Sequence, residues 1–158
     1  MPERRIAVVG CGNILMQDDG LGVRAIERLC ERGVPERVDL IDAGTALMDV
    51  LPDLGEAERI ILVDAIRTGG EPGAIYRMPL AELENRMKQP ESKCSLHEVE
   101  LREALVLARL ENAKLDEGLV FGMEPAAVEP GMELSESVER AMPRLLDAIS
   151  HEIGSPKE

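Results

Sequence analysis

Two carboxylates and one imidazole lie where predicted strands end and a predicted helix begins. Asp19 belongs to a glycine-rich loop after an apolar strand, Asp64 is the last residue of another strand, and His97 lies in the first turn of a helix. Carboxylate oxygens and an imidazole nitrogen suit a borderline divalent ion such as Zn²⁺ or Ni²⁺. These three residues are therefore the candidate catalytic and metal-binding residues.

The glycine-rich loop, residues 10–22, follows the apolar strand Ile6–Gly10 and leads into a helix. Many folds bind phosphate at such a turn, through backbone N–H groups at the helix N-terminus. Here Asp18 and Asp19 would repel a phosphate, and Leu15 stands where the dinucleotide motif G-x-G-x-x-G needs its third glycine. The loop therefore favours a metal cation over a nucleotide.

Each candidate residue also has a simpler structural interpretation, which the sequence alone leaves open. Asp18 or Asp19 can cap the helix that follows, and Asp64 can accept hydrogen bonds from the loop after its strand. Cys94 lies three residues before His97, a spacing that permits a thiol–imidazole pair, although a plain surface thiol is the simpler interpretation.

Short apolar runs alternate with helical patterns along the chain, which predicts an α/β fold. The predicted strands are Ile6–Gly10, Val38–Asp42, Arg59–Asp64, Ala74–Met78 and Leu115–Gly122. The predicted helices are Leu21–Arg32, a short one around residues 46–51, Leu80–Lys88, one from His97 to about Leu110, and a last one that Ser135 caps.

The connection Ala65–Gly73 is too short for the crossover that parallel strands require. The strand after it should therefore run antiparallel, at an edge of the sheet. The predicted architecture is a three-layer α/β sandwich: a five-stranded, mostly parallel twisted sheet with one antiparallel edge strand and helices on both faces.

This architecture brings the candidate residues together. Ser95 and Glu98 form a capping box that places His97 at the start of its helix. A helix that returns antiparallel to its strands starts at their carboxyl edge, where ligands bind in open α/β sheets. Asp19, Asp64 and His97 should converge there. Because a helix N-terminus disfavours an imidazolium, we also expect His97 to be neutral and able to ligate.

Composition limits the classes of function. At 158 residues with 44% apolar residues, the chain should form one domain over residues 1–158. The net charge of −13 argues against nucleic-acid binding, and no apolar run is long enough to cross a membrane. Three cysteines without a C-x-x-C pair disfavour a disulfide framework. Since the N-terminal residues show no apolar signal region, we expect a cytoplasmic protein.

Five further motifs follow the glycine-rich loop in order along the chain. They are Asp42-Ala43-Gly44-Thr45, Leu62-Val63-Asp64-Ala65, Ser95-Leu96-His97, Phe121-Gly122-Met123-Glu124-Pro125 and Gly131-Met132-Glu133-Leu134-Ser135. Together with the loop over residues 10–24, these motifs resemble a known family, the nickel–iron hydrogenase maturation endopeptidases. The resemblance extends through nearly the whole chain.

The resemblance implies a protease that removes a C-terminal extension from a hydrogenase large-subunit precursor after nickel insertion. It also implies that Asp19, Asp64 and His97 form the site that senses nickel, which the precursor delivers and the free enzyme holds weakly at most. Three positions depart from the family pattern. Asp19 replaces a frequent glutamate, Ala43 a usual glycine, and Glu100 a common small residue. They leave the ligands in place but bear on the choice of partner.

The sequence leaves two other functions open. One is a non-catalytic nickel-binding chaperone or docking module on the same fold, which would hold nickel without cleaving anything. The other is a hydrolase related to peptidyl-tRNA hydrolase, whose first loop also begins G-x-G-N but continues with proline, where this chain has Ile14. For the protease we expect an aspartyl-type endopeptidase-like enzyme that acts as a monomer on a nickel-loaded precursor, without nucleic acid or membrane.

Overall fold

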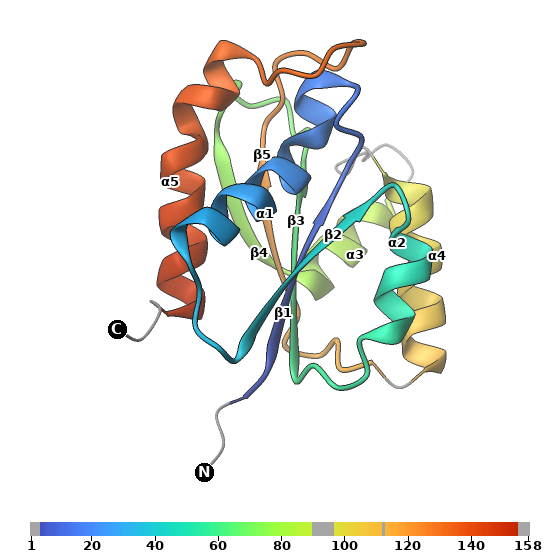
Figure 1. Cartoon of the computed structure of the whole chain (residues 1–158). Coiled ribbons are helices and arrows are strands. Elements are labelled where there is room, and N and C mark those ends of the chain that lie inside the picture. Colours follow the sequence, from blue (N-terminus) through green and yellow to red (C-terminus); the bar gives the residue numbers. More distant parts are fainter. Residues whose placement is uncertain (1–3, 90–96, 112, 155–158) are drawn as a thin grey trace.

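The computed structural model describes residues 4–89, 97–111 and 113–154. Its centre is a five-stranded sheet in the order β2-β1-β3-β5-β4, shown in Figure 1. The strands are β1 (Ile6–Cys11), β2 (Val38–Gly44), β3 (Arg59–Ala65), β4 (Ile75–Pro79) and β5 (Leu119–Met123). The expected fold class is confirmed: β1, β2, β3 and β5 are parallel, and β4 pairs antiparallel with β5 at one edge.

Helices cover both faces of this sheet (Figure 1). One face carries α1 (Leu21–Arg32) and α5 (Glu136–Ile153), and the other carries α2 (Leu47–Val50), α3 (Leu80–Met87) and α4 (Glu98–Leu110). Two short 3₁₀ turns, η1 (Gln17–Gly20) and η2 (Leu51–Asp53), precede α1 and follow α2. Within the described ranges, no helix is long and apolar enough to cross a membrane.

Most predicted boundaries differ from the observed ones by one or two residues. Strand β3 ends at Ala65, so Asp64 is its second-to-last residue and not its last. Strand β5 begins at Leu119 rather than Leu115, because Gly118 donates a backbone hydrogen bond to the carbonyl of Leu115 and closes a turn there. Helix α4 begins at Glu98, so that His97 is the residue before the first turn rather than a member of it. The capping residue expected for this helix, Ser95, lies outside the described residues.

The core consists of two aliphatic layers on either side of the sheet. β3 is apolar on both faces because helices cover both of them, and Ile60, Ile61, Leu62 and Val63 are all buried. The only phenylalanine, Phe121 of β5, is fully buried under α5. This packing leaves the carboxyl ends of the parallel strands as the edge where loops gather.

Helix α1 lies very close to the sheet, and glycine makes this possible. A Cβ atom at Gly22 would overlap the carbonyl oxygens of Val63 and Cys11, and one at Gly10 would overlap the carbonyl oxygen of Gly22. Gly12 has a φ of +132°, which side chains rarely permit. The glycines of the first loop therefore serve close helix–strand packing, and this packing fixes the loop that carries Asp19.

We predict that Gly22→Ala destabilises the protein by about 1–3 kcal/mol, because its methyl group would meet backbone atoms that have no room to move. Urea denaturation measures this loss. Gly55→Ala is the matched control, since the nearest atom to its added methyl group lies 3.9 Å away. Equal stability of the two variants would contradict the packing argument.

Candidate active site

Asp19, Asp64 and His97 meet at the carboxyl edge of the sheet, with the imidazole ring between the two carboxylates. Nδ1 of His97 lies 3.1 Å from Oδ1 of Asp64, and Nε2 lies 3.1 Å from Oδ2 of Asp19. The side chains of the three residues are 5–12% exposed. The sequence-based convergence is therefore observed, as a chain of carboxylate, imidazole and carboxylate that remains in contact with solvent.

Each carboxylate is fixed by the backbone as well as by the imidazole. Oδ2 of Asp19 accepts a hydrogen bond of 3.0 Å from the N–H of Asn13, across the first loop. Oδ1 of Asp64 accepts one of 2.8 Å from the N–H of Ala65, the next residue in the chain. His97 itself is held by its place at the start of α4, where its carbonyl accepts from the N–H of Leu101.

The charge state of His97 differs from the sequence-based expectation. Burial lowers the pKa of His97, but its hydrogen bonds to Asp19 and Asp64 outweigh burial and raise the pKa from 6.5 to about 10. Burial likewise raises the pKa of Asp19, but the bonds from His97 and Asn13 bring it below its ordinary value. The expected neutral imidazole was wrong for this arrangement, because two carboxylates in contact outweigh a helix terminus.

Asp18 has a different task from its neighbour. Neither Asp18 nor Asp19 caps α1, whose first residues make no side-chain cap. Instead the buried Asp18 carboxylate accepts four hydrogen bonds of 2.7–2.9 Å, from the backbone N–H groups of Ala126, Ala127 and Ser135 and from the Ser135 hydroxyl. It thus ties the first loop to the loop before α5.

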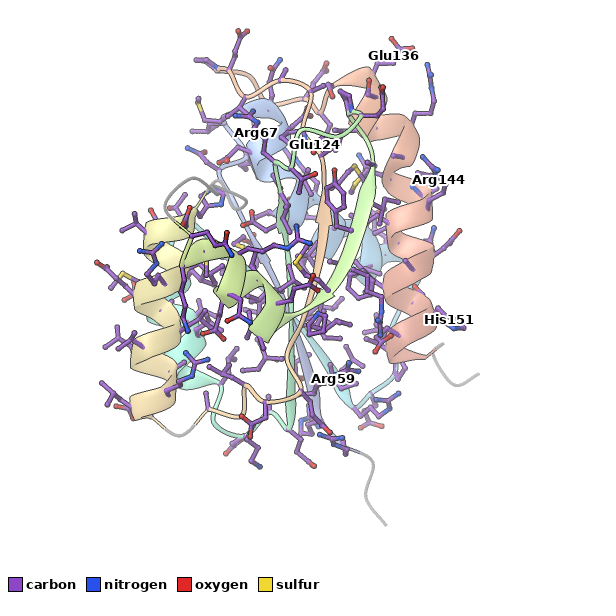
Figure 2. The ribbon with its side chains drawn as sticks, turned by 180° about the vertical axis from the view of Figure 1, so that it is seen from behind. Arg59, Arg67, Glu124, Glu136, Arg144 and His151 are labelled. Carbon is purple, nitrogen blue, oxygen red and sulfur yellow. The ribbon has the colours of Figure 1, made fainter. Side chains whose placement is uncertain are left out.

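Glu124 is a site-edge residue whose role was not predicted. It is 3% exposed, and its Oε1 accepts from the N–H of Thr68 (2.9 Å), the N–H of Gly70 (3.0 Å) and the hydroxyl of Tyr76 (2.7 Å). Through Thr68 and Gly70, Glu124 thus fixes the loop between β3 and β4. Figure 2 shows Glu124 at the same end of the sheet as Arg67 of that loop, with Arg59, which starts β3, at the opposite end. A glutamate directly after an apolar strand was the available signal.

The described cysteines offer no nucleophile to this site. Cys11 is buried, its Sγ lies 3.5 Å from the carbonyl oxygen of Val63, and burial raises the pKa of its thiol well above the usual value. Cys30 is exposed on α1, away from the three site residues. Cys94 lies outside the described residues, and its pairing with His97 stays a hypothesis.

The donor set fits a borderline metal ion, although the ring lies between the two carboxylates. Nε2 of His97 and Oδ2 of Asp19 are 3.1 Å apart, a separation that two ligands of one ion span when each lies about 2.1 Å from it. Asp64 faces the other nitrogen of the same ring. Within the described ranges, no group of three or more His, Cys, Asp or Glu residues is arranged to hold an ion.

Comparison with known proteins identifies the family. A sequence profile of hydrogenase maturation proteases matches residues 23–152, a range that contains Asp64 and His97. A putative hydrogenase maturation protease of Methanocaldococcus jannaschii is 34% identical over 163 aligned positions, which cover 97% of this chain and 99% of that relative. The chain belongs to the hydrogenase maturation protease family.

Other relatives support the same family. The hydrogenase maturating endopeptidase HybD of Escherichia coli has a similar structure, with a TM-score of 0.81 and 31% identity over 95% of this chain and 94% of that one. A hydrogenase expression/formation protein of Rhodobacter capsulatus is 35% identical over 129 residues, or 81% of this chain, but the match spans only 60% of that relative. The chain is thus an endopeptidase of this family.

We predict that the metal-free protease loses part of its stability as the pH rises from 6.5 towards 10. The folded pKa of His97 is raised to about 10 from 6.5, so its stabilising charge is fully present below pH 6.5 and disappears as the pH approaches 10. Thermal melting in a chelator, across this pH range, should show that the difference in melting temperature between wild type and His97→Gln becomes smaller as the pH rises. A constant difference would mean that the imidazolium does not contribute.

Proposed function

We propose that this protease is a nickel-dependent endopeptidase that removes the C-terminal extension of a nickel–iron hydrogenase large-subunit precursor after nickel insertion. The observation that carries the proposal is the His97 imidazole between the carboxylates of Asp19 and Asp64, on a member of this family. Two oxygen donors and one nitrogen donor meet at the edge where ligands bind in open α/β sheets. A precursor that presents nickel there would meet Asp19 and His97 as neighbouring ligands, with Asp64 behind the ring.

Nickel in this proposal belongs to the precursor. The chain has two histidines, and Figure 2 shows His151 near the C-terminal end of α5, at the opposite end of the sheet from Glu124. A self-contained zinc peptidase commonly uses two or more histidines from its own chain. One imidazole and two carboxylates match a site whose remaining ligands come from the precursor, such as cysteine thiolates that already hold the nickel.

The three side chains have separate tasks in this mechanism. Asp19 presents an oxygen, and His97 presents its Nε2 nitrogen once the proton on that nitrogen has been released to solvent, as ligation of an ion requires. Asp64 accepts from the N–H at Nδ1 and fixes the orientation of the ring. For Asp64 to contact the same ion as Asp19, the ring between them must turn aside. The nickel ion supplies Lewis acidity, which either polarises the scissile carbonyl or activates a water.

Among the alternatives, a nickel chaperone on the same fold differs from the protease in one observable: it leaves the precursor uncut. The names of the relatives, which are proteases and endopeptidases, favour cleavage. Aspartyl-type chemistry, a monomeric state and a cytoplasmic location remain predictions.

We expect Asp19→Asn, Asp64→Asn and His97→Gln each to reduce processing of a nickel-loaded precursor by at least about 100-fold, the usual contribution of a group that acts in the reaction. Isosteric variants are preferred to alanine, because the side chains are nearly buried and alanine would leave their partners unpaired. Gel analysis of the shortened product measures the rate. Asp147→Asn, an exposed aspartate of α5, is the control. Normal rates in the three variants would refute the assignment.

The nickel requirement has its own test. Precursor without nickel should bind poorly and remain uncut, and zinc added to the enzyme alone should not restore cleavage, because the missing ligands belong to the precursor. The same preparation loaded with nickel serves as the positive control. Efficient cleavage of the nickel-free precursor would refute nickel recognition while leaving the protease activity intact.

A further inference from the structure

Helix α4 is apolar on two opposite faces. Its inner face packs on the core through Leu101, Ala104, Leu105 and Ala108. On the outer face Val99, Val106 and Leu110 are 68%, 55% and 73% exposed. A surface helix normally turns charged and polar residues outward, and clustered exposed apolar side chains mark interaction sites. Within the described residues, α4 carries most of the large apolar side chains that are exposed.

The outer residues form a regular seam. Positions 99, 103, 106 and 110 follow the spacing of four, three and four that places a and d residues of a coiled coil on one side of a helix. At about 100° per residue, the four positions fall within an arc of about 60°. Glu103 is the only polar member of this outer seam. Such a seam fits another helix better than a flat surface or an extended strand.

From this pattern we infer that the outer seam of α4 docks an amphipathic helix of the hydrogenase precursor, with a lysine or arginine opposite Glu103. The inference rests on the proposed function. Glu103 is exposed, and within the described ranges no ion pair to it is present, whereas Arg102 and Arg109 beside the seam already pair with Glu98 and Glu84. A docking helix would bury Glu103 at its contact, so a positive partner is needed there.

Charge also separates this partner from a second copy of the chain. Each copy has a net charge of −13, so two copies repel one another. A two-fold pair of α4 helices would bring the two Glu103 side chains into one apolar seam, where like charges without partners are costly. A precursor helix with a basic residue avoids both costs.

The seam also lies at the proposed site. Val99 is two residues after His97, so the seam begins where the imidazole meets Asp19 and Asp64. A precursor whose helix lies along α4 would hold its nickel and its C-terminal extension near these residues. The docking would act on affinity for the folded precursor rather than on the chemical step.

The test uses two seam variants of the full chain, Val106→Ser combined with Leu110→Ser, and Glu103→Lys. Glu31→Lys, an exposed charge reversal on α1 at the other face of the sheet, is the control. Each seam variant should raise KM for the nickel-loaded precursor by about tenfold, the effect of losing 1.4 kcal/mol of binding, with kcat unchanged. Thermal melting should confirm that the exposed substitutions leave the fold intact.

Direct binding of the precursor separates the two proposals. Weaker binding by both seam variants, with normal binding by Glu31→Lys, supports the docking inference even if no precursor is cut, in which case only the proposed function fails. Unchanged KM and unchanged binding in the seam variants would overturn the inference while cleavage by the wild type stands. Sedimentation that shows a wild-type dimer and a monomeric Val106→Ser, Leu110→Ser variant would instead identify a self-interface and overturn it.

Discussion

Four carboxylates are buried at one edge of the sheet, and the surrounding structure must compensate their negative charge. In the described chain they are Asp18, Asp19, Asp64 and Glu124. A buried charge is costly unless hydrogen bonds or an opposite charge compensate it. Asp18 and Glu124 obtain compensation from loop N–H groups and hydroxyls, whereas Asp19 and Asp64 share the imidazole of His97. Two of the acids therefore hold loops together at this edge, and the other two have the His97 imidazole as their shared partner.

The adjacent aspartates of the first loop show how this division arises. The backbone turn η1 points Asp18 towards the loop before α5 and Asp19 towards His97. Because Ser135 both donates to Asp18 and accepts from Val138 as the cap of α5, the first loop is fastened to that helix. The position of Asp19 is thus set from two sides, by α1 packed on its glycines and by α5 through Asp18.

Much of the fold was predictable from the sequence, because it depends on local patterns. The apolar run of β3 and the short connection after it predicted a doubly covered strand and an antiparallel edge strand, both of which the structure contains. The meeting of Asp19, Asp64 and His97 followed from one rule about the carboxyl edge of a parallel sheet. The partners of Asp18 were not predictable, since they lie more than 100 residues away and, apart from the Ser135 hydroxyl, are backbone groups of irregular loops. The raised pKa of His97 depends on contacts at about 3 Å, which element order alone does not determine.

The bond between Tyr76 and Glu124 gives the molecule an optical property. Tyr76 is the only tyrosine, and the chain contains no tryptophan. Its hydroxyl, which donates to Glu124 and contacts Thr68, sits on the loop that follows Asp64. Tyrosine absorption and tyrosine fluorescence of the unlabelled protein therefore come from one ring, whose hydroxyl contacts the loop after β3. A tail peptide that contains neither tryptophan nor tyrosine would let that ring report its arrival without any dye.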